Sequence, residues 1–151
     1  MMRSACLALL LSAVLAGCAS TPQATNARDA ETKQFQSYPA TSGIYIYRVD
    51  RNLDSDLPVL YLDGRLIGAS LPRSYFRVDV NPGWHSLNGV AADLGNFTLE
   101  TRPDQVYYIE LTALGSQSHY RLVPAAAAQR ALLACCSLME SWAPGQRPLL
   151  R

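Results

Sequence analysis

Few side chains in this sequence are of the kinds that carry out acid–base, nucleophilic or metal chemistry, and their spacing matches no catalytic motif. His85 and His119 are far apart, and neither has a histidine or cysteine at metal-ligand spacing. The sequence contains no nucleophile elbow, P-loop, His-Glu-x-x-His segment or dinucleotide fingerprint. His85 follows a Pro-Gly turn, where a hydrogen-bonded strand residue near the rim is a more ordinary role than a general base. We therefore expect no enzymatic activity and no metal or other cofactor.

Two adjacent cysteines near the C-terminus, Cys135 and Cys136, are the most reactive pair in the sequence. A disulfide between sequence neighbours closes a small strained ring and is incompatible with a helix, so the helix predicted here excludes an ordinary intrachain bridge. Both side chains fall on the apolar side of that helix. We expect buried, inert thiols, with an intermolecular disulfide or capture of a soft metal ion as the alternatives.

Aromatic side chains supply the remaining candidates for a binding site. Tyr45 and Tyr47 share one face of the first predicted strand, and Tyr107 lies in the predicted strand that is richest in apolar residues. Tyrosines in such positions ordinarily stabilise a sheet as cross-strand pairs, which is the interpretation we favour. Exposed together, they would stack on sugar rings or bury a partner's side chain. Tyr45, Tyr47 and Tyr107 are therefore the predicted binding residues.

Turn residues between short alternating segments indicate the elements that must position these side chains. Asp63-Gly64 separates two apolar segments and supplies the positive φ that a two-residue hairpin loop needs. Asn81-Pro82-Gly83 makes a second turn, after residues 75–80, whose alternation predicts a strand with one buried face. Strands recur in this way from 42 to 123. The pattern predicts an antiparallel β-sandwich or small barrel.

A single amphipathic helix is predicted after the strands. Pro124 suits the start of a helix, and strong helix formers continue from 125 to 142, with apolar side chains on one arc and polar ones opposite. Because the polar side lacks the Lys and Arg enrichment of interfacial helices, we expect this helix to pack on the open sheet or to cap the barrel. A membrane-surface or partner-binding helix is the alternative.

The N-terminus has the features of a secretory signal. Arg3 precedes a short apolar run from 5 to 15, which is followed by small residues. The segment Leu15-Ala16-Gly17-Cys18 resembles a bacterial lipobox, which implies diacylglycerol transfer to the Cys18 thiol, cleavage before Cys18 and usually acylation of the new amine. Because Ala19 stands where an Asp would retain the protein at the inner membrane, the resemblance favours the outer membrane and a domain facing the periplasm.

These features divide the chain into a signal peptide (1–17), a polar tether from the acylated cysteine (18–41), a β-domain with a C-terminal helix (42–142) and a tail (143–151). A flexible tether of this length would span roughly 25 Å and hold the domain off the membrane. Acyl chains on Cys18 would anchor it stably in a lipid membrane. Since Arg3 is the only charged residue in 1–17, basic and acidic side chains balance afterwards, which argues against nucleic-acid binding.

Several segments together carry a resemblance to a known family. They are the lipobox, Ile44-Tyr45-Ile46-Tyr47-Arg48, residues 60–68 around the Asp-Gly turn, and Pro82-Gly83-Trp84-His85. The chain up to about Val123 resembles a family of bacterial lipoproteins with a domain of unknown function, and the strand-Asp-Gly-strand segment is similar to PEGA-type surface β-domains. The resemblance implies a fold and an envelope location. We expect a periplasmic binding or interaction module, or alternatively a structural accessory that docks a larger membrane complex through an envelope protein partner.

Overall fold

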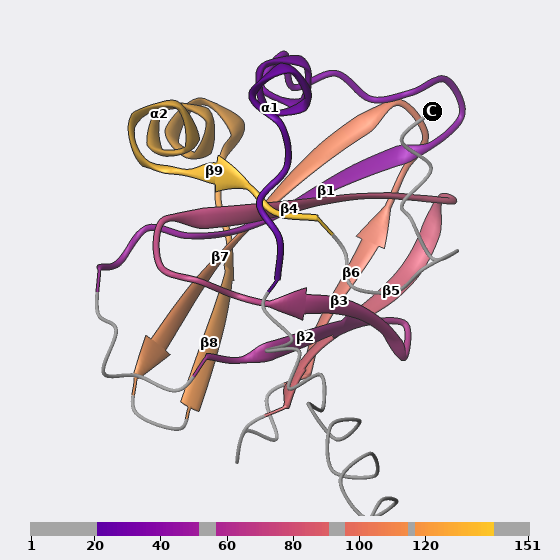
Figure 1. The fold of residues 1–151 in the computed structure, drawn as a ribbon. Helices are drawn as coiled ribbons and strands as arrows, with labels where there is room; N and C mark the ends of the chain where they lie inside the picture. The colour runs from indigo at the N-terminus through magenta and orange to yellow at the C-terminus, as the bar shows by residue number, and fades with distance from the viewer. Residues whose placement is uncertain (1–20, 52–56, 91–95, 115–116, 141–151) are drawn as a thin grey trace, which may run out of the picture.

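A computed structural model of the chain describes residues 21–51, 57–90, 96–114 and 117–140. Two β-sheets lie face to face, and two helices lie side by side on the outer face of one of them (Figure 1). The elements in chain order are α1 (Asn26–Thr32), β1 (Ser42–Arg48), β2 (Val59–Leu62), β3 (Arg65–Ala69), β4 (Ser74–Val80), β5 (Gly83–Val90), β6 (Asn96–Thr101), β7 (Gln105–Leu114), β8 (Gln117–Leu122), α2 (Ala125–Cys135) and β9 (Ser137–Leu138).

The predicted β-sandwich with a C-terminal helix is confirmed. One sheet has five strands in the order β8-β7-β1-β4-β9, and the other has four in the order β3-β2-β5-β6. Most neighbouring strands are antiparallel, as expected, but β1 runs parallel to β7 and β9 runs parallel to β4. Each parallel pair joins strands that are separated by long stretches of chain: all four strands of the second sheet lie between β1 and β7 in the sequence, and α2 precedes β9.

The two predicted turns form as their residue types require. Asp63 and Gly64 both have positive φ, at 53° and 73°, and join β2 to β3. Asn81-Pro82-Gly83 joins β4 to β5, with Gly83 at φ 144°. A Cβ at either glycine would meet no heavy atom within 4 Å, so both glycines are needed for their backbone conformation and not for close packing.

Both faces of β1 and β4 are buried, which corrects the prediction of one buried face. The side chains that point between the sheets form the main core, with Ile44, Ile46 and Phe76 among its members. On the opposite face Tyr75, Arg77 and Asp79 are also at most 6% exposed, since α1, α2 and the segment between α1 and β1 cover them. Polar residues therefore line the layer between the five-stranded sheet and its helices.

The C-terminal helix ends earlier than the sequence pattern predicts. The pattern predicts a helix over 125–142, but α2 ends at Cys135 and Cys136 is extended, with φ −117° and ψ 146°. Ala128 and Leu132 are fully buried against the sheet, so the expected packing of the helix on the sheet is confirmed. The residues that follow the helix form β9, which pairs with β4. Neither described helix is long and apolar enough to cross a membrane.

Residues 21–41 are part of the folded domain, so the prediction of a free polar tether over 18–41 is wrong for its described part. Thr21, Ala24 and Thr32 are at most 7% exposed. Ala24 N donates to Leu138 O (2.9 Å), and the hydroxyl of Tyr45 donates to Thr32 O (2.6 Å). Polar residues here are stabilised by hydrogen bonds to distant strands, which composition does not reveal. The signal peptide, Cys18 and the tail lie outside the described residues.

Asp29 joins three segments, and we expect its carboxylate to be needed for stability. Its Oδ1 accepts hydrogen bonds from the Tyr75 hydroxyl (2.9 Å) and Leu138 N (2.8 Å), and its Oδ2 pairs with Lys33 Nζ (2.8 Å). The substitution Asp29→Asn should lower the free energy of unfolding at pH 7 by about 1–3 kcal/mol, measured by urea denaturation. Glu31→Gln on the exposed side of the same helix is the control and should change little.

The stabilisation by the Asp29 carboxylate should decrease as the pH falls. Burial alone would raise the pKa of Asp29, but hydrogen bonds from Lys33, Leu138 N and Tyr75 outweigh burial and hold this pKa below its ordinary value of 3.8. Wild-type protein should therefore hold this stabilisation above pH 3.8 and lose it as the pH falls through the folded-state pKa. The stability gap between wild type and Asp29→Asn should narrow over that range. A constant gap down to pH 2.5 would contradict this role.

Candidate functional site

The predicted binding residues Tyr45 and Tyr47 lie inside the fold. They are 0% and 2% exposed, so the exposed tyrosine face that binding requires does not form. The Tyr45 ring stacks on Tyr75 and Tyr108, with ring centroids 5.9 Å and 5.2 Å away. Burial raises the pKa of Tyr45 and Tyr75, and it raises the pKa of Tyr47 to about 12. These side chains stabilise the sheet beneath the helices, which agrees with the structural interpretation.

Tyr107 lies apart from the other two predicted residues. It packs against the core between the sheets, whereas its neighbour Tyr108 faces the helices. Its hydroxyl accepts a hydrogen bond from Arg102 N (3.0 Å). Glu100, Arg102, Pro103 and Gln105 join Tyr107 around a shallow surface depression of about 680 Å³. The structure therefore does not bring the three predicted tyrosines together, and only Tyr107 borders solvent.

A buried ion pair lies in the layer between sheet and helices. Arg77 Nη2 is 2.9 Å from Asp79 Oδ1 and 2.8 Å from Gln36 O, and the guanidinium lies over the Tyr38 ring, 4.9 Å from its centroid. Burial raises the pKa of Asp79, and Arg77 offsets this only in part. Asp79 Oδ2 is buried without a hydrogen-bond partner among the described residues. Arg77 fixes the segment between α1 and β1 onto the sheet, at a position that solvent does not reach.

His85 and Asp63 form a hydrogen-bonded pair near the ends of two strands. His85 Nδ1 is 2.7 Å from Asp63 Oδ2, and His85 Nε2 is 2.8 Å from Asn81 O. Both ring nitrogens therefore lie within hydrogen-bond distance of oxygen atoms of the chain, which gives the ring a structural role. The neighbouring hydroxyl of Ser86 is directed to Asn88 Oδ1, 3.3 Å away. The pair ties the β2–β3 turn to the β4–β5 turn.

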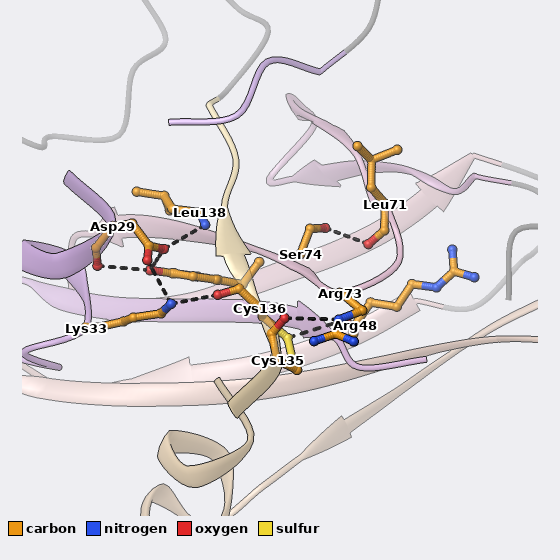
Figure 2. The surroundings of a disulfide bond; sticks show 10 residues. Asp29, Lys33, Arg48, Leu71, Arg73, Ser74, Cys135, Cys136 and Leu138 are labelled. Carbon is orange, nitrogen blue, oxygen red and sulfur yellow. Dashed lines mark hydrogen bonds and ion pairs between the residues drawn. A yellow bond between two sulfur atoms is a disulfide. The ribbon is translucent and has the colours of Figure 1, made fainter. Parts of the chain in front are cut away.

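The two cysteines are joined to each other, which corrects the exclusion of an intrachain disulfide and the expectation of free thiols. Figure 2 shows the Cys135–Cys136 bond at the C-terminal end of α2. The bond is compatible with the fold because Cys136 has left the helix. Cys136 is 3% exposed and Cys135 is half-buried. Among the described residues, no three His, Cys, Asp or Glu side chains are grouped as metal ligands.

Of the two described helices, neither lies on the outer face of the four-stranded sheet, since both lie on the five-stranded sheet (Figure 1). Because Leu60, Leu62, Leu87 and Leu99 point into the core, the alternate residues of β2, β5 and β6 point outward. We call this surface the open sheet face. Its members include Val59, Tyr61, Leu66, Trp84, Ser86, Asn88, Asn96, Thr98 and Glu100.

Trp84 is the large hydrophobic side chain of the open sheet face that is most exposed to solvent. It is 72% exposed, more than the other exposed large hydrophobic residues of the described chain. Trp84 is opposite Glu100, Ser86 opposite Thr98, and Asn88 opposite both Asn96 and Tyr61. The sequence held one usable signal, since the alternation from Trp84 to Leu87 places Trp84 on the side opposite the core residue Leu87. Aromatic rings beside hydroxyl and amide groups can stack on a flat ligand and hydrogen-bond around it.

The fold and surface define a two-sheet β-sandwich with one helix-covered face and one open face. Part of the chain is 33% identical, over 108 residues, to an uncharacterized protein of Haemophilus influenzae. The aligned region covers 68% of this chain and 60% of that protein, so the chain spans less than two thirds of the relative's length. No family model matches the chain, and no solved structure matches it. The resemblance to lipoproteins and PEGA-type domains stays a prediction.

The His85–Asp63 pair gives a testable structural role. Asp63→Asn keeps a residue type that tolerates positive φ but removes the charge next to His85. Because the Asp63 side chain is 41% exposed, we expect a loss of only about 0.5–1 kcal/mol in the free energy of unfolding, measured by urea denaturation. Asp104→Asn, at another residue with positive φ, is the matched control for the backbone effect. A loss of more than about 3 kcal/mol would show a larger role than the geometry supports.

Proposed function

We propose that this protein is an acylated lipoprotein of the bacterial cell envelope that presents its β-domain as a binding module in the periplasm, anchored in the outer membrane through Cys18. The lipobox-like segment before Cys18 supports the anchor. The open sheet face supports the binding role, and the exposure of Trp84 is the observation that carries it. A tryptophan that is 72% exposed covers little of its own domain, so its large apolar surface is available to a ligand.

The contacts of the described N-terminal residues support a position close to the membrane for an acylated protein. Thr21 Oγ1 accepts a hydrogen bond from Ala69 N (3.0 Å), and Pro22 O accepts one from Glu140 N (2.8 Å). Only two residues separate Cys18 from Thr21, and a fully extended chain covers at most about 3.6 Å per residue. An acylated Cys18 would therefore hold the docked Thr21 within roughly 11 Å of the lipid attachment point, and the domain would rest near the headgroups.

We propose a glycan of the cell envelope as the ligand class. The groups around Trp84 on the open sheet face are mostly uncharged hydroxyl and amide side chains: Tyr61, Ser86, Asn88, Asn96 and Thr98. Sugar rings present apolar faces that stack on indole, and hydroxyl groups that exchange hydrogen bonds with amides. A large contiguous apolar patch would instead favour a protein partner.

The alternative is a structural or assembly accessory that docks a larger membrane complex. Exposed leucines favour it: Leu133 on α2 is 61% exposed, Leu114 on β7 is 62% exposed and Leu122 on β8 is 48% exposed. Exposed polar residues, such as Arg121 and Arg130, lie between these leucines. All three leucines lie on the five-stranded sheet or on the helix that covers it. A partner at this surface would therefore leave the open sheet face free.

Lipid attachment predicts a specific labelling result. Cells that express the full chain and are fed an alkyne-tagged fatty acid should give a labelled protein in the outer-membrane fraction, because the Cys18 thiol is the acceptor. Cys18→Ser should abolish the label and the membrane association together. Cys6→Ser is the matched control, since that cysteine lies inside the predicted signal, and should leave the label intact. Labelling that persists in Cys18→Ser would exclude the anchor.

Glycan binding predicts a loss on removal of Trp84. Purified full chain should sediment with isolated peptidoglycan sacculi, and Trp84→Ala should weaken this association at least about tenfold, or roughly 1.4 kcal/mol. Leu133→Ala removes an exposed apolar side chain elsewhere and is the control. Equal sedimentation of Trp84→Ala and wild type would contradict the proposed face. If sacculi are not bound, but a photoreactive residue at 133 captures one envelope protein in cells, the accessory role is the better proposal.

A further inference from the structure

The Cys135–Cys136 bond lies at the junction between two kinds of backbone. Cys135 is the last residue of α2, and Cys136 is extended, with its N–H donating to Leu132 O (3.2 Å). On an α-helix successive side chains are about 100° apart around the axis, so neighbouring residues do not face each other. A covalent bond between the sulfurs of two successive residues therefore requires that one of them leaves the helix.

The sequence supplies no other stop signal at this junction. From 125 to 142 it contains neither Gly nor Pro, and its apolar pattern continues past Cys136 through Leu138 and Met139. The described helix nevertheless ends at Cys135. The bond between the cysteines is the feature at this point that a helix cannot accommodate, so the bond accounts for the difference between the helical pattern and the structure.

Ending the helix here allows β9 to dock on β4. Ser137 N donates to Arg73 O (3.1 Å) and Met139 N donates to Tyr75 O (2.9 Å). Cys136 O accepts a hydrogen bond from Lys33 Nζ (2.7 Å), as Figure 2 shows. None of these backbone contacts is compatible with a helix that continues through the same residues.

Docked β9 in turn holds residues 22–24, which precede α1. Ala24 N donates to Leu138 O (2.9 Å), Gln23 forms an antiparallel bridge with Met139, and Leu138 N donates to Asp29. Residues 22–24 and β9 thus hold each other in place. The position of β9 depends in turn on where α2 ends.

We propose that Cys135 and Cys136 form a site of reversible two-electron oxidation whose state determines whether β9 is docked. With the bond intact, α2 ends at Cys135 and β9 pairs with β4. With the bond reduced, both residues can be helical, α2 extends toward Met139, and β9 separates from β4 and from residues 22–24. This inference does not depend on lipid attachment.

The reductant is a dithiol, either a small molecule or a thiol-disulfide oxidoreductase. Its thiolate attacks the Cys135 sulfur, which is the more exposed of the two, so that a mixed disulfide forms and Cys136 leaves as a thiolate and takes up a proton. The second thiolate of the reductant then attacks the mixed disulfide, closes the reductant's own disulfide and releases Cys135, which is also protonated. Two electrons and two protons are transferred to the pair. A disulfide oxidant reverses the sequence.

Hydrogen exchange tests the proposal on the full chain carrying Cys6→Ser and Cys18→Ser, so that the pair holds the remaining thiols. Alkylation should give no adduct without reductant, and an adduct on each of Cys135 and Cys136 after treatment with dithiothreitol. Reduction should speed amide exchange at Ala24, Leu138 and Met139 by about tenfold or more, because these amides donate to bonds that depend on docked β9. Exchange in β1 and β7 should stay slow.

A variant that lacks both sulfurs gives the matched control. In Cys135→Ser/Cys136→Ser, exchange at Ala24 and Met139 should be fast with or without dithiothreitol, while β1 and β7 stay protected and show that the domain is folded. Slow exchange at Met139 after reduction would overturn the proposal, because the bond would then not control docking. Equally fast exchange in β1 and β7 would also overturn it, because reduction would then unfold the domain as a whole. Alkylation without reductant would show that the bond is absent.

Discussion

The carboxylate of Asp29 is the contact on which the helical side of this domain depends. It comes from a short helix and accepts hydrogen bonds from a strand hydroxyl, Tyr75, and from the backbone of β9, at Leu138. Lys33, one turn later, pairs with Asp29 and also donates to Cys136 O. A seven-residue helix has too little apolar surface to dock by burial alone. Charge-assisted hydrogen bonds in a partly buried site supply the missing stabilisation and fix the orientation.

This contact also explains why the two outer faces of the sandwich differ. The helical side buries Tyr45, Tyr75 and Tyr108 together with the Arg77–Asp79 pair, so its aromatic and charged groups are satisfied within the fold. Neither described helix covers the other outer face, and Trp84 there is 72% exposed. Aromatic residues thus take two roles that depend on which sheet they belong to. Because the described helices cover only the five-stranded sheet, the four-stranded sheet is the one that presents an aromatic side chain to a ligand.

The sequence predicted those features that depend on local backbone chemistry. Asp63-Gly64 formed the expected turn because positive φ is a property of the residue types themselves. The burial of Tyr45 and Tyr47 could not be predicted, because it depends on α1 and the segment after it, and composition predicts that region as a tether. Asp29 contacts Tyr75 and Leu138, which are 46 and 109 residues away in the sequence. Hydrogen bonds between residues so far apart in the sequence leave no periodic pattern of residue types. The Cys135–Cys136 bond leaves none either, because the helical pattern of apolar residues continues past the point where the helix ends.

The N-terminal anchor and the cysteine pair meet in the same piece of structure, and this joins the two proposals physically. With β9 docked, Thr21 is fixed against Ala69, and an acylated Cys18 would have roughly 11 Å of chain between lipid and domain. Release of β9 removes the hydrogen-bond partner of Ala24 and one of the three partners of Asp29, so residues 22–24 lose their contacts with 138–140. Reduction of one disulfide would therefore loosen the chain that follows the anchor, because residues 22–24 are held through β9 in the oxidised domain.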